Sequence, residues 1–333
     1  HTQSYLKNMR GQNLFITGGT GFVGSWLVEC LLHANKVLAL DMHISLLSRD
    51  PLNFGKSYPH LVNDSAIKLI KGDVRNLVSD GKFYDIVIHA ATDASAMINR
   101  RDPLIMADTI VDGTRKVLEF SKQVCAKRLL MLSSGAVYGT IMNGVTHVKE
   151  NSSNGPDPLN SYYTYSESKR MAELLCSIYS KQFGLNFSVA RLFAFVGPRL
   201  PLDSHFAIGN FIRDGLAGKS IQVSGDGKAM RSYLYAAELV VWLLAILVKG
   251  KKGRAYNVGS DQGISILELA KKVATSFTCH PDVNVADKTD GSNLISHYVP
   301  DISRAHEELG LKVNISLSDA ISRTVASHQF KTS

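Results

Sequence analysis

A tyrosine and a lysine, Tyr165 and Lys169, stand four residues apart in the segment YYTYSESKRMAEL. The segment has helical spacing, and residues four apart on a helix share one face. A tyrosine with an unperturbed pKa of about 10 is a weak base at neutral pH. A neighbouring ammonium group favours the phenolate and brings the tyrosine closer to its working range. The pair is therefore a candidate general base acting on an alcohol.

A hydroxyl residue at the end of an apolar run supplies a third member of such a site. Residues 129–131 have the pattern of a buried strand, and LSSGAVYG completes and follows this run. Within it, Ser134 is the candidate for binding the reacting oxygen. The next two residues, Gly135 and Ala136, have side chains that transfer no proton. Chemistry at this strand end is thus limited to what the hydroxyl and the tyrosine can do.

A glycine loop with phosphate-binding spacing follows the first β-rich run. In ITGGTGFVGSW, three glycines, Gly18, Gly21 and Gly24, stand at intervals of three. Glycine lets backbone amides approach a pyrophosphate at a helix amino end, where the helix dipole favours an anion. The third glycine lets the helix pack closely on the strand. We expect a dinucleotide site here.

Acidic residues after the next strand-like runs extend this site. Asp41 ends the expected second strand, where a carboxylate accepts hydrogen bonds from an adenosine ribose and repels a 2′-phosphate. NAD is therefore favoured over NADP, although Arg49 further along keeps NADP open. In GDV, Asp73 and Val74 are candidates for contact with the adenine, with a strand-end cap as the alternative for the aspartate.

The segment HAAT ends the expected fourth strand with small residues. Ala90 and Ala91 would leave room for a cofactor, whereas His89 is expected to be structural.

The alternation of β-rich and helical segments predicts the fold class. Nearly continuous apolar strands are typical of a parallel sheet covered by helices on both faces. We expect an α/β fold, with a Rossmann-type doubly wound parallel sheet in residues 10–195 that includes the Tyr/Lys helix. Residues 196–330 are expected to form a smaller C-terminal α/β lobe that mainly binds substrate. The expected strands are residues 13–17, 36–41, 67–73, 84–90, 128–133 and 186–192.

Composition limits the partners. The 333 residues carry a net charge of +8, but Lys and Arg are spread along the chain, so a small anionic ligand is favoured over nucleic acid. The longest apolar run, residues 239–248, is too short to cross a bilayer. The cysteines form no CxxC motif, so we expect neither a disulfide framework nor a metal site, but reduced, buried thiols in a cytoplasmic protein. They are Cys30, Cys125, Cys176 and Cys279.

Taken together, seven segments carry a resemblance to a known family. TGGTGFVG, GDV, HAAT, SSGAVYG, YSESK, RLFAFVGP and RSYLYAAEL occur in this order between residue 13 and about residue 260. The chain resembles an extended short-chain dehydrogenase/reductase of the NAD-dependent nucleotide-sugar epimerase/dehydratase family. The resemblance implies that Tyr165 takes a proton from a sugar hydroxyl while hydride moves to NAD. It also implies that Lys169 holds the ribose and lowers the tyrosine pKa, and that Ser134 binds the reacting oxygen.

The same resemblance assigns binding roles. Phe22 and Val23 would offer backbone amides to the cofactor pyrophosphate, and Arg231 would grip the substrate diphosphate. The family often has Asn where this chain has Ala194. His205 and Asn210, on the segment that follows, are candidates to take over the phosphate contact, with a polar helix face as the alternative.

The loop after Ser134 bears on the reaction. Dehydratases of the family usually carry an Asp-Glu pair there, and decarboxylating members similarly place a glutamate, whereas this chain has Gly135 and Ala136. We therefore expect epimerisation through a transient 4-keto sugar. A 4-keto reductase, a 4,6-dehydratase using acids from elsewhere such as Asp93, and a catalytically idle NAD-binding module remain alternatives.

The family commonly forms homodimers through two long helices, here near residues 104–121 and 161–183. Apolar contacts would come from Ala107, Val117, Leu118, Met171, Leu174 and Leu175.

Overall fold

The computed structural model describes residues 5–92, 96–141, 144–152, 154–204, 206–286 and 296–329. The chain forms two compact units and passes between them several times. The first unit comprises His1–Gly139, Gly155–Arg191 and Val240–Tyr256, and the second Thr140–Asn154, Leu192–Leu239 and Asn257–Ser333. The sequence suggested one boundary near residue 195, whereas segments of both units alternate along the chain.

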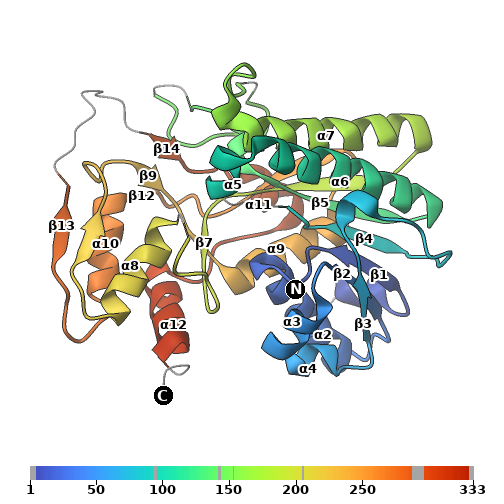
Figure 1. The fold of residues 1–333 in the computed structure, drawn as a ribbon, viewed down its shortest axis with the longest axis horizontal. Coiled ribbons are helices and arrows are strands. Elements are labelled where there is room, and N and C mark those ends of the chain that lie inside the picture. The colour runs from blue at the N-terminus through green and yellow to red at the C-terminus, as the bar shows by residue number, and fades with distance from the viewer. Residues whose placement is uncertain are drawn as a thin grey trace. The chain divides into compact units, whose positions relative to one another are not determined.

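The expected Rossmann-type sheet is confirmed as a seven-stranded sheet with the order β11-β6-β5-β4-β1-β2-β3 (Figure 1). Its strands are β1 Asn13–Thr17, β2 His43–Ser48, β3 Ile67–Lys71, β4 Ile86–His89, β5 Arg128–Ser134, β6 Phe187–Leu192 and β11 Arg254–Val258. The pairs from β3 to β5 are parallel. The strand order reverses at the β1–β4 pair, and doubly wound sheets bind ligands at the carboxyl ends of strands at such a point.

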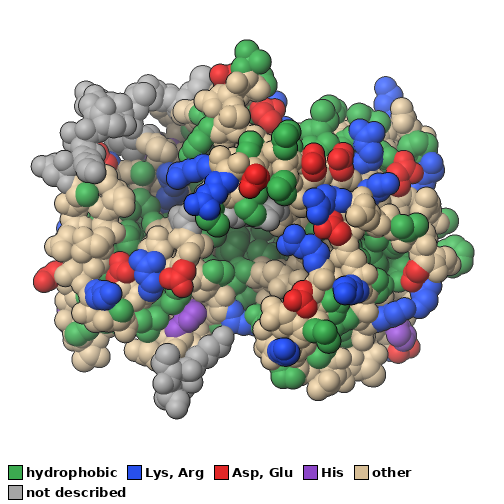
Figure 2. Space-filling model, viewed as in Figure 1, with side chains coloured by type: hydrophobic (Ala, Val, Ile, Leu, Met, Phe, Trp, Pro, Cys, Tyr) green, Lys and Arg blue, Asp and Glu red, His purple; other side chains and the backbone are tan. Residues whose placement is uncertain are grey.

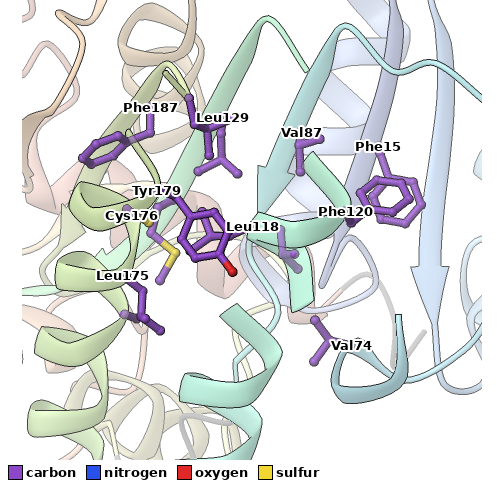
Figure 3. Packing of buried hydrophobic residues seen from close by; sticks show 14 of the residues in the cluster. Phe15, Val74, Val87, Leu118, Phe120, Leu129, Leu175, Cys176, Tyr179 and Phe187 are labelled. Atoms are coloured by element: carbon purple, nitrogen blue, oxygen red, sulfur yellow. The ribbon is translucent and has the colours of Figure 1, made fainter. Parts of the chain in front are cut away.

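Long helices cover the sheet because their apolar stripes must be buried. On one face, α6 (Pro103–Gln123) and α7 (Thr164–Phe183) pack over the strands. Figure 3 shows this cluster, in which Phe120 of α6 lies against Phe15 of β1 with ring centroids 4.4 Å apart. Helix α2 (Phe22–Val37) follows the glycine loop, which approaches Leu46 of β2.

One strand prediction is wrong. Residues 36–41 were expected to form the second strand, but α2 continues to Val37 and the strand is β2. The Asn35 side chain closes the intervening turn, because its amide donates to the Met42 carbonyl at 3.1 Å and its carbonyl accepts from the Met42 amide at 2.9 Å. Asp41 therefore lies before β2, at its amino end, with φ of 54°.

The second unit contains short elements, as expected for the C-terminal part. Its three small sheets have the orders β10-β7, β12-β9-β14 and β13-β8. The strands are β7 Phe195–Val196, β8 Ile221–Val223, β9 Met230–Arg231, β10 Leu234–Tyr235, β12 Ile264–Ser265, β13 Val283–Val285 and β14 His297–Tyr298. The helices are α8 Ala207–Leu216, α10 Ile266–Ala274, α11 Ser303–Leu309 and α12 Leu317–Gln329, while α9 (Ala236–Lys249) belongs to both units.

The surface charges and the cysteines bear on the remaining expectations from the sequence. On the face shown in Figure 2, Lys and Arg side chains are interspersed with Asp and Glu side chains. No described helix combines the length and apolarity needed to cross a membrane. The four cysteines are unbridged, but the expectation that all are buried is wrong, since Cys125 and Cys279 are exposed at turns.

Candidate active site

The three predicted catalytic residues meet in the first unit. Ser134 is the last residue of β5, and Tyr165 and Lys169 lie one turn apart on α7. The Ser134 hydroxyl lies close enough to the Tyr165 phenol to lower the pKa of that phenol. The Lys169 ammonium donates to the Leu132 carbonyl at 2.9 Å, and the lysine is only 2% exposed. The Asn99 side chain accepts from the Tyr165 amide at 3.0 Å, which fixes the start of α7.

Burial sets the protonation of this group. It lowers the pKa of Lys169 to about 8, although the charge of Glu173 opposes the shift. Burial also raises the pKa of Tyr165, and the Ser134 hydroxyl acts in the opposite direction. In the protein alone, the tyrosine pKa is thus raised rather than lowered by its surroundings. Its activation requires additional positive charge beside the phenol.

An ion pair that the sequence did not suggest lies one turn further along α7. Glu173 accepts from Arg191 Nε at 3.0 Å and from Nη2 at 2.6 Å, and from the Ser133 hydroxyl at 2.6 Å. Arg191 also donates to the Tyr138 hydroxyl at 2.9 Å. Burial alone would lower the pKa of Arg191, but hydrogen bonds and charge from Glu173 raise it overall. The pair fixes β5, α7 and β6 to one another beside the catalytic residues.

The loop after Ser134 forms the short 3-10 helix Gly135–Tyr138. The Ser134 hydroxyl caps it by accepting from the Ala136 amide at 3.2 Å. Gly139 closes the loop with φ of 64°, and a Cβ there would lie 2.6 Å from the Pro156 nitrogen. Side chains able to transfer a proton are absent from Gly135 and Ala136, so these two positions add no acid or base to the site.

The glycine loop is shaped for close backbone approach. Gly18 has φ of 71°, and a Cβ there would lie 2.4 Å from the Ala90 carbonyl carbon and the Ala91 nitrogen. A Cβ on Gly24 would lie 2.1 Å from the Gly18 carbonyl oxygen. At Gly21, which precedes α2 directly, the nearest atom would be 3.5 Å away. These residues fit a dinucleotide pyrophosphate at the amino end of α2, where Phe22 and Val23 form the first turn.

His89 contacts Thr17, the residue that directly precedes the glycine loop. Its Nδ1 lies 2.8 Å from the Thr17 hydroxyl and its Nε2 lies 3.1 Å from the Thr114 hydroxyl. Burial lowers its pKa to about 3, with Lys169 acting in the same direction, so the ring is neutral at physiological pH. This arrangement is that of a structural histidine.

The two acidic residues expected at the dinucleotide site, Asp73 and Asp41, lie at different ends of the sheet's strands. Asp73 caps the 3-10 helix Val74–Asn76, and its two oxygens accept from Arg75 at 2.9 and 3.0 Å. These hydrogen bonds lower its pKa to about 2. Asp41 is not brought to the glycine loop, because it lies at the amino end of a strand parallel to β1. The prediction that it ends the second strand is wrong.

The predicted substrate residues belong to the second unit. Arg231 ends β9, where its guanidinium donates to the Ser296 carbonyl at 3.1 Å and lies 5.9 Å from the Tyr298 ring centroid. The Asn210 side chain, on α8, accepts from Arg213 at 3.2 Å. His205 and Asp93 lie outside the described residues. Within the described ranges, no three His, Cys, Asp or Glu side chains are grouped to hold a metal ion.

Comparisons with known proteins show the family of the chain. Residues 14–259 match the model of the NAD dependent epimerase/dehydratase family. The chain is 30% identical over 326 residues to UDP-glucuronic acid decarboxylase 6 of Arabidopsis thaliana, covering 96% of this chain and 89% of the relative. It is 28% identical over 330 residues to UDP-glucuronic acid decarboxylase 1 of Xenopus tropicalis, covering 98% and 74%.

Solved structures share the fold. The UDP-glucose 4-epimerase of Thermotoga maritima, solved with UDP-glucose, matches with a TM-score of 0.80 and 22% identity, covering 96% of this chain and 100% of that one. The dTDP-glucose 4,6-dehydratase of Streptomyces venezuelae, solved with NAD, matches with a TM-score of 0.82 and 23% identity, covering 96% and 97%.

Proposed function

We propose that this chain, which belongs to the NAD-dependent epimerase/dehydratase family, inverts one carbon of a nucleotide-diphosphate sugar through a transient 4-keto intermediate. Membership of the family gives NAD-dependent modification of a nucleotide sugar as the general activity. The finer assignment rests on one observation. Ser134, Tyr165 and Lys169 meet at the end of β5, and the loop that follows them carries Gly135 and Ala136.

The three side chains account for the proton movements. Tyr165 takes the proton of the sugar C4 hydroxyl, and the Ser134 hydroxyl holds the oxygen that becomes the ketone. Lys169, with its pKa lowered to about 8, remains mostly protonated at neutral pH and would hold the cofactor ribose, while the positive charge of the bound nicotinamide would favour the Tyr165 phenolate. Bound NAD would supply the hydride acceptor, and as NADH the hydride donor, for C4. The ketone would rotate within the site before the hydride returns to its opposite face, and Tyr165 would give its proton back to the oxygen, so that C4 is inverted.

Dehydration requires more than this set provides. Loss of water across C5 and C6 needs an acid for the leaving hydroxyl and a base for the C5 proton, in addition to the tyrosine. Gly135 and Ala136 can be neither. The loop therefore favours a reaction that needs the tyrosine alone.

Decarboxylation is the second candidate, because the two curated relatives named above are UDP-glucuronic acid decarboxylases. Oxidation at C4 of a uronic acid places a ketone β to the carboxylate, and a β-keto acid loses CO2 readily. Ser134, Tyr165 and Lys169 would begin this reaction as they begin epimerisation. The subsequent return of a proton to C5 is the step for which the loop supplies no side chain.

A product screen separates these reactions. Purified protein is incubated with UDP-, dTDP-, GDP- and CDP-hexoses and with UDP-glucuronic acid, and the products are followed by NMR. The proposal expects inversion at C4 with no net formation of reduced cofactor, and loss of this activity in Tyr165→Phe. Release of CO2 from the uronic acid, a 4-keto-6-deoxy product, or binding of cofactor without any turnover would each overturn it.

Substrate binding and assembly extend the proposal. Arg231 would hold the substrate diphosphate, since a guanidinium fork suits phosphate geometry, and Asn210 would assist. The cofactor would be contacted by Ala90, Ala91 and Val74 beside the glycine loop. We place the reaction in the cytoplasm, which suits the unbridged cysteines.

The proposed homodimer would use exposed apolar residues of α6 and α7. Leu174 is 54% exposed and Met171 is 45% exposed, and Leu104 of α6 is 77% exposed. Three of the residues expected at this interface are instead in the buried core cluster: Val117, Leu118 and Leu175. Light scattering should show a dimer that Leu174→Glu dissociates. Leu52→Glu on α3 (Pro51–Ser57), which changes another exposed leucine, 80% exposed, should leave the dimer intact.

A further inference from the structure

The carboxyl end of β2 lies beside the glycine loop. In the parallel pairing of β1 with β2, Thr17 is opposite Leu47, so the two strands end at the same level. Ser48 follows Leu47 as Gly18 follows Thr17. On its other side, Ser48 is opposite Lys71 and its carbonyl accepts from the Gly72 amide at 2.9 Å. In a doubly wound sheet, the residues at this strand end face the adenosine ribose of a dinucleotide.

The carboxylates that could accept hydrogen bonds from the ribose hydroxyls either already have hydrogen-bond partners or lie far from this strand end. Asp41 lies at the opposite end of β2, a full strand length away. Asp50 caps α3 by accepting from the Asn53 amide at 3.1 Å. Both oxygens of Asp73 are hydrogen-bonded to Arg75. The strand end itself carries the hydroxyl of Ser48, which is 5% exposed, and the exposed guanidinium of Arg49.

Arg49 is available to a ligand. It is exposed, and within the described residues it makes no hydrogen bond or ion pair. Its charge contributes to lowering the pKa of Asp73, which follows β3. A guanidinium binds a phosphate with two parallel hydrogen bonds, and a serine hydroxyl can add a third.

We propose that Ser48 and Arg49 form a subsite for a phosphate on the 2′ position of the adenosine ribose. The chain then binds NADP(H) at least as tightly as it binds NAD(H). This inference concerns the dinucleotide site alone, and it holds whichever sugar reaction the protein performs.

The test measures binding rather than turnover. Full-length protein, stripped of co-purified nucleotide, is titrated calorimetrically with NADP+ and with NAD+. Arg49→Ala should weaken NADP+ binding by about 10- to 100-fold, the effect of losing hydrogen bonds to a charged group, and leave NAD+ binding within about twofold. Ser48→Asp, which installs a carboxylate at the strand end, should reverse the preference toward NAD+.

Lys56→Ala is the matched control, because Lys56 is an exposed cation on α3 only seven residues further along the chain. It removes the same charge and should leave both affinities unchanged. Wild-type protein that binds NAD+ more than tenfold tighter than NADP+ would overturn the proposal. So would an Arg49→Ala variant whose ratio of the two affinities equals that of the wild type. Because both results come from binding, they are separate from failure of the proposed epimerase activity.

Discussion

Replacing Glu173 with glutamine tests whether the buried ion pair beside the catalytic residues stabilises the first unit. The change keeps the volume of the side chain and one carbonyl acceptor, but it removes the charge opposite Arg191. In the wild type, the carboxylate accepts from Nε at 3.0 Å and from Nη2 at 2.6 Å of Arg191, and both side chains are only 15% exposed. The variant therefore leaves a largely buried guanidinium without its countercharge.

The expected cost follows from this burial. Removing one partner of a buried pair costs about 3–5 kcal/mol. The remaining exposure of Arg191 and the retained glutamine carbonyl reduce this to about 2–3 kcal/mol of unfolding free energy. With an unfolding entropy of about 0.7 kcal/mol/K for a chain of this length, the melting temperature should fall by roughly 3–4 °C.

Calorimetry measures this shift, and a second glutamate on α7 provides the control. Glu167 pairs with Arg170 at 3.4 Å, but these side chains are 32% and 41% exposed. Exposed pairs contribute about 0.2–1 kcal/mol, so Glu167→Gln should lower the melting temperature by about 1 °C or less. Replacing both Glu173 and Arg191 with methionine should recover part of the loss. A Glu173→Gln variant that melts within about 1 °C of the wild type would refute the reasoning.

Three other predictions concern the site. Gly24→Ala forces a Cβ to within 2.1 Å of the Gly18 carbonyl oxygen, so calorimetric titration should show NAD binding weakened by more than about tenfold. Gly55→Ala on α3, whose Cβ would meet nothing closer than 3.6 Å, should keep the affinity; equal losses in both variants would show that the close packing is not the cause. Tyr165→Phe should reduce kcat by about 10²- to 10⁴-fold with an unchanged circular dichroism spectrum, and unchanged kcat would remove the tyrosine from the mechanism. Asp73 has a folded-state pKa of about 2 against 3.8 ordinarily, so its contribution is present above pH 3.8 and is lost as pH falls toward 2. Urea unfolding should show Asp73→Asn about 1 kcal/mol less stable than wild type at pH 7, a value reduced for the 39% exposure of Arg75. The difference should narrow as pH falls from about 4 toward 2, and a constant difference would contradict the assigned ion pair.

The motifs that depend on local spacing were predictable from the sequence. Tyr165 and Lys169 share a face of α7 because four residues complete about one helical turn. Gly18 and Gly24 occupy positions that a side chain could not, as the strand–glycine–helix pattern indicates. The fold class followed from the alternation of apolar strands with helices.

The position of β2 was not predictable from local pattern alone. VLALD and HISLLS are both apolar, strand-like runs in immediate succession, and an aspartate after the first resembles the expected acid. The choice depends on the length of α2 and on the clamp from the Asn35 side chain to Met42, which is a contact between residues on either side of the turn.

The Glu173–Arg191 pair escaped prediction because it joins α7 to β6 through tertiary packing. Spacing supplies one signal, since Glu173 lies four residues after Lys169 on the same helix face. Its partner is eighteen residues away in sequence, and only the folded sheet brings the two together.

The fate of a deuterium atom placed on C4 of an accepted nucleotide sugar tests the central claim most directly. The proposed reaction returns that atom to the carbon it left, so NMR and mass spectrometry should find the deuterium on C4 of the inverted sugar, with no net reduced cofactor. Deuterium on C6 of a dehydrated product would show that the site removes water despite Gly135 and Ala136. Retention on C4 with loss of CO2 would identify a decarboxylase, and either result would contradict the assignment as an epimerase.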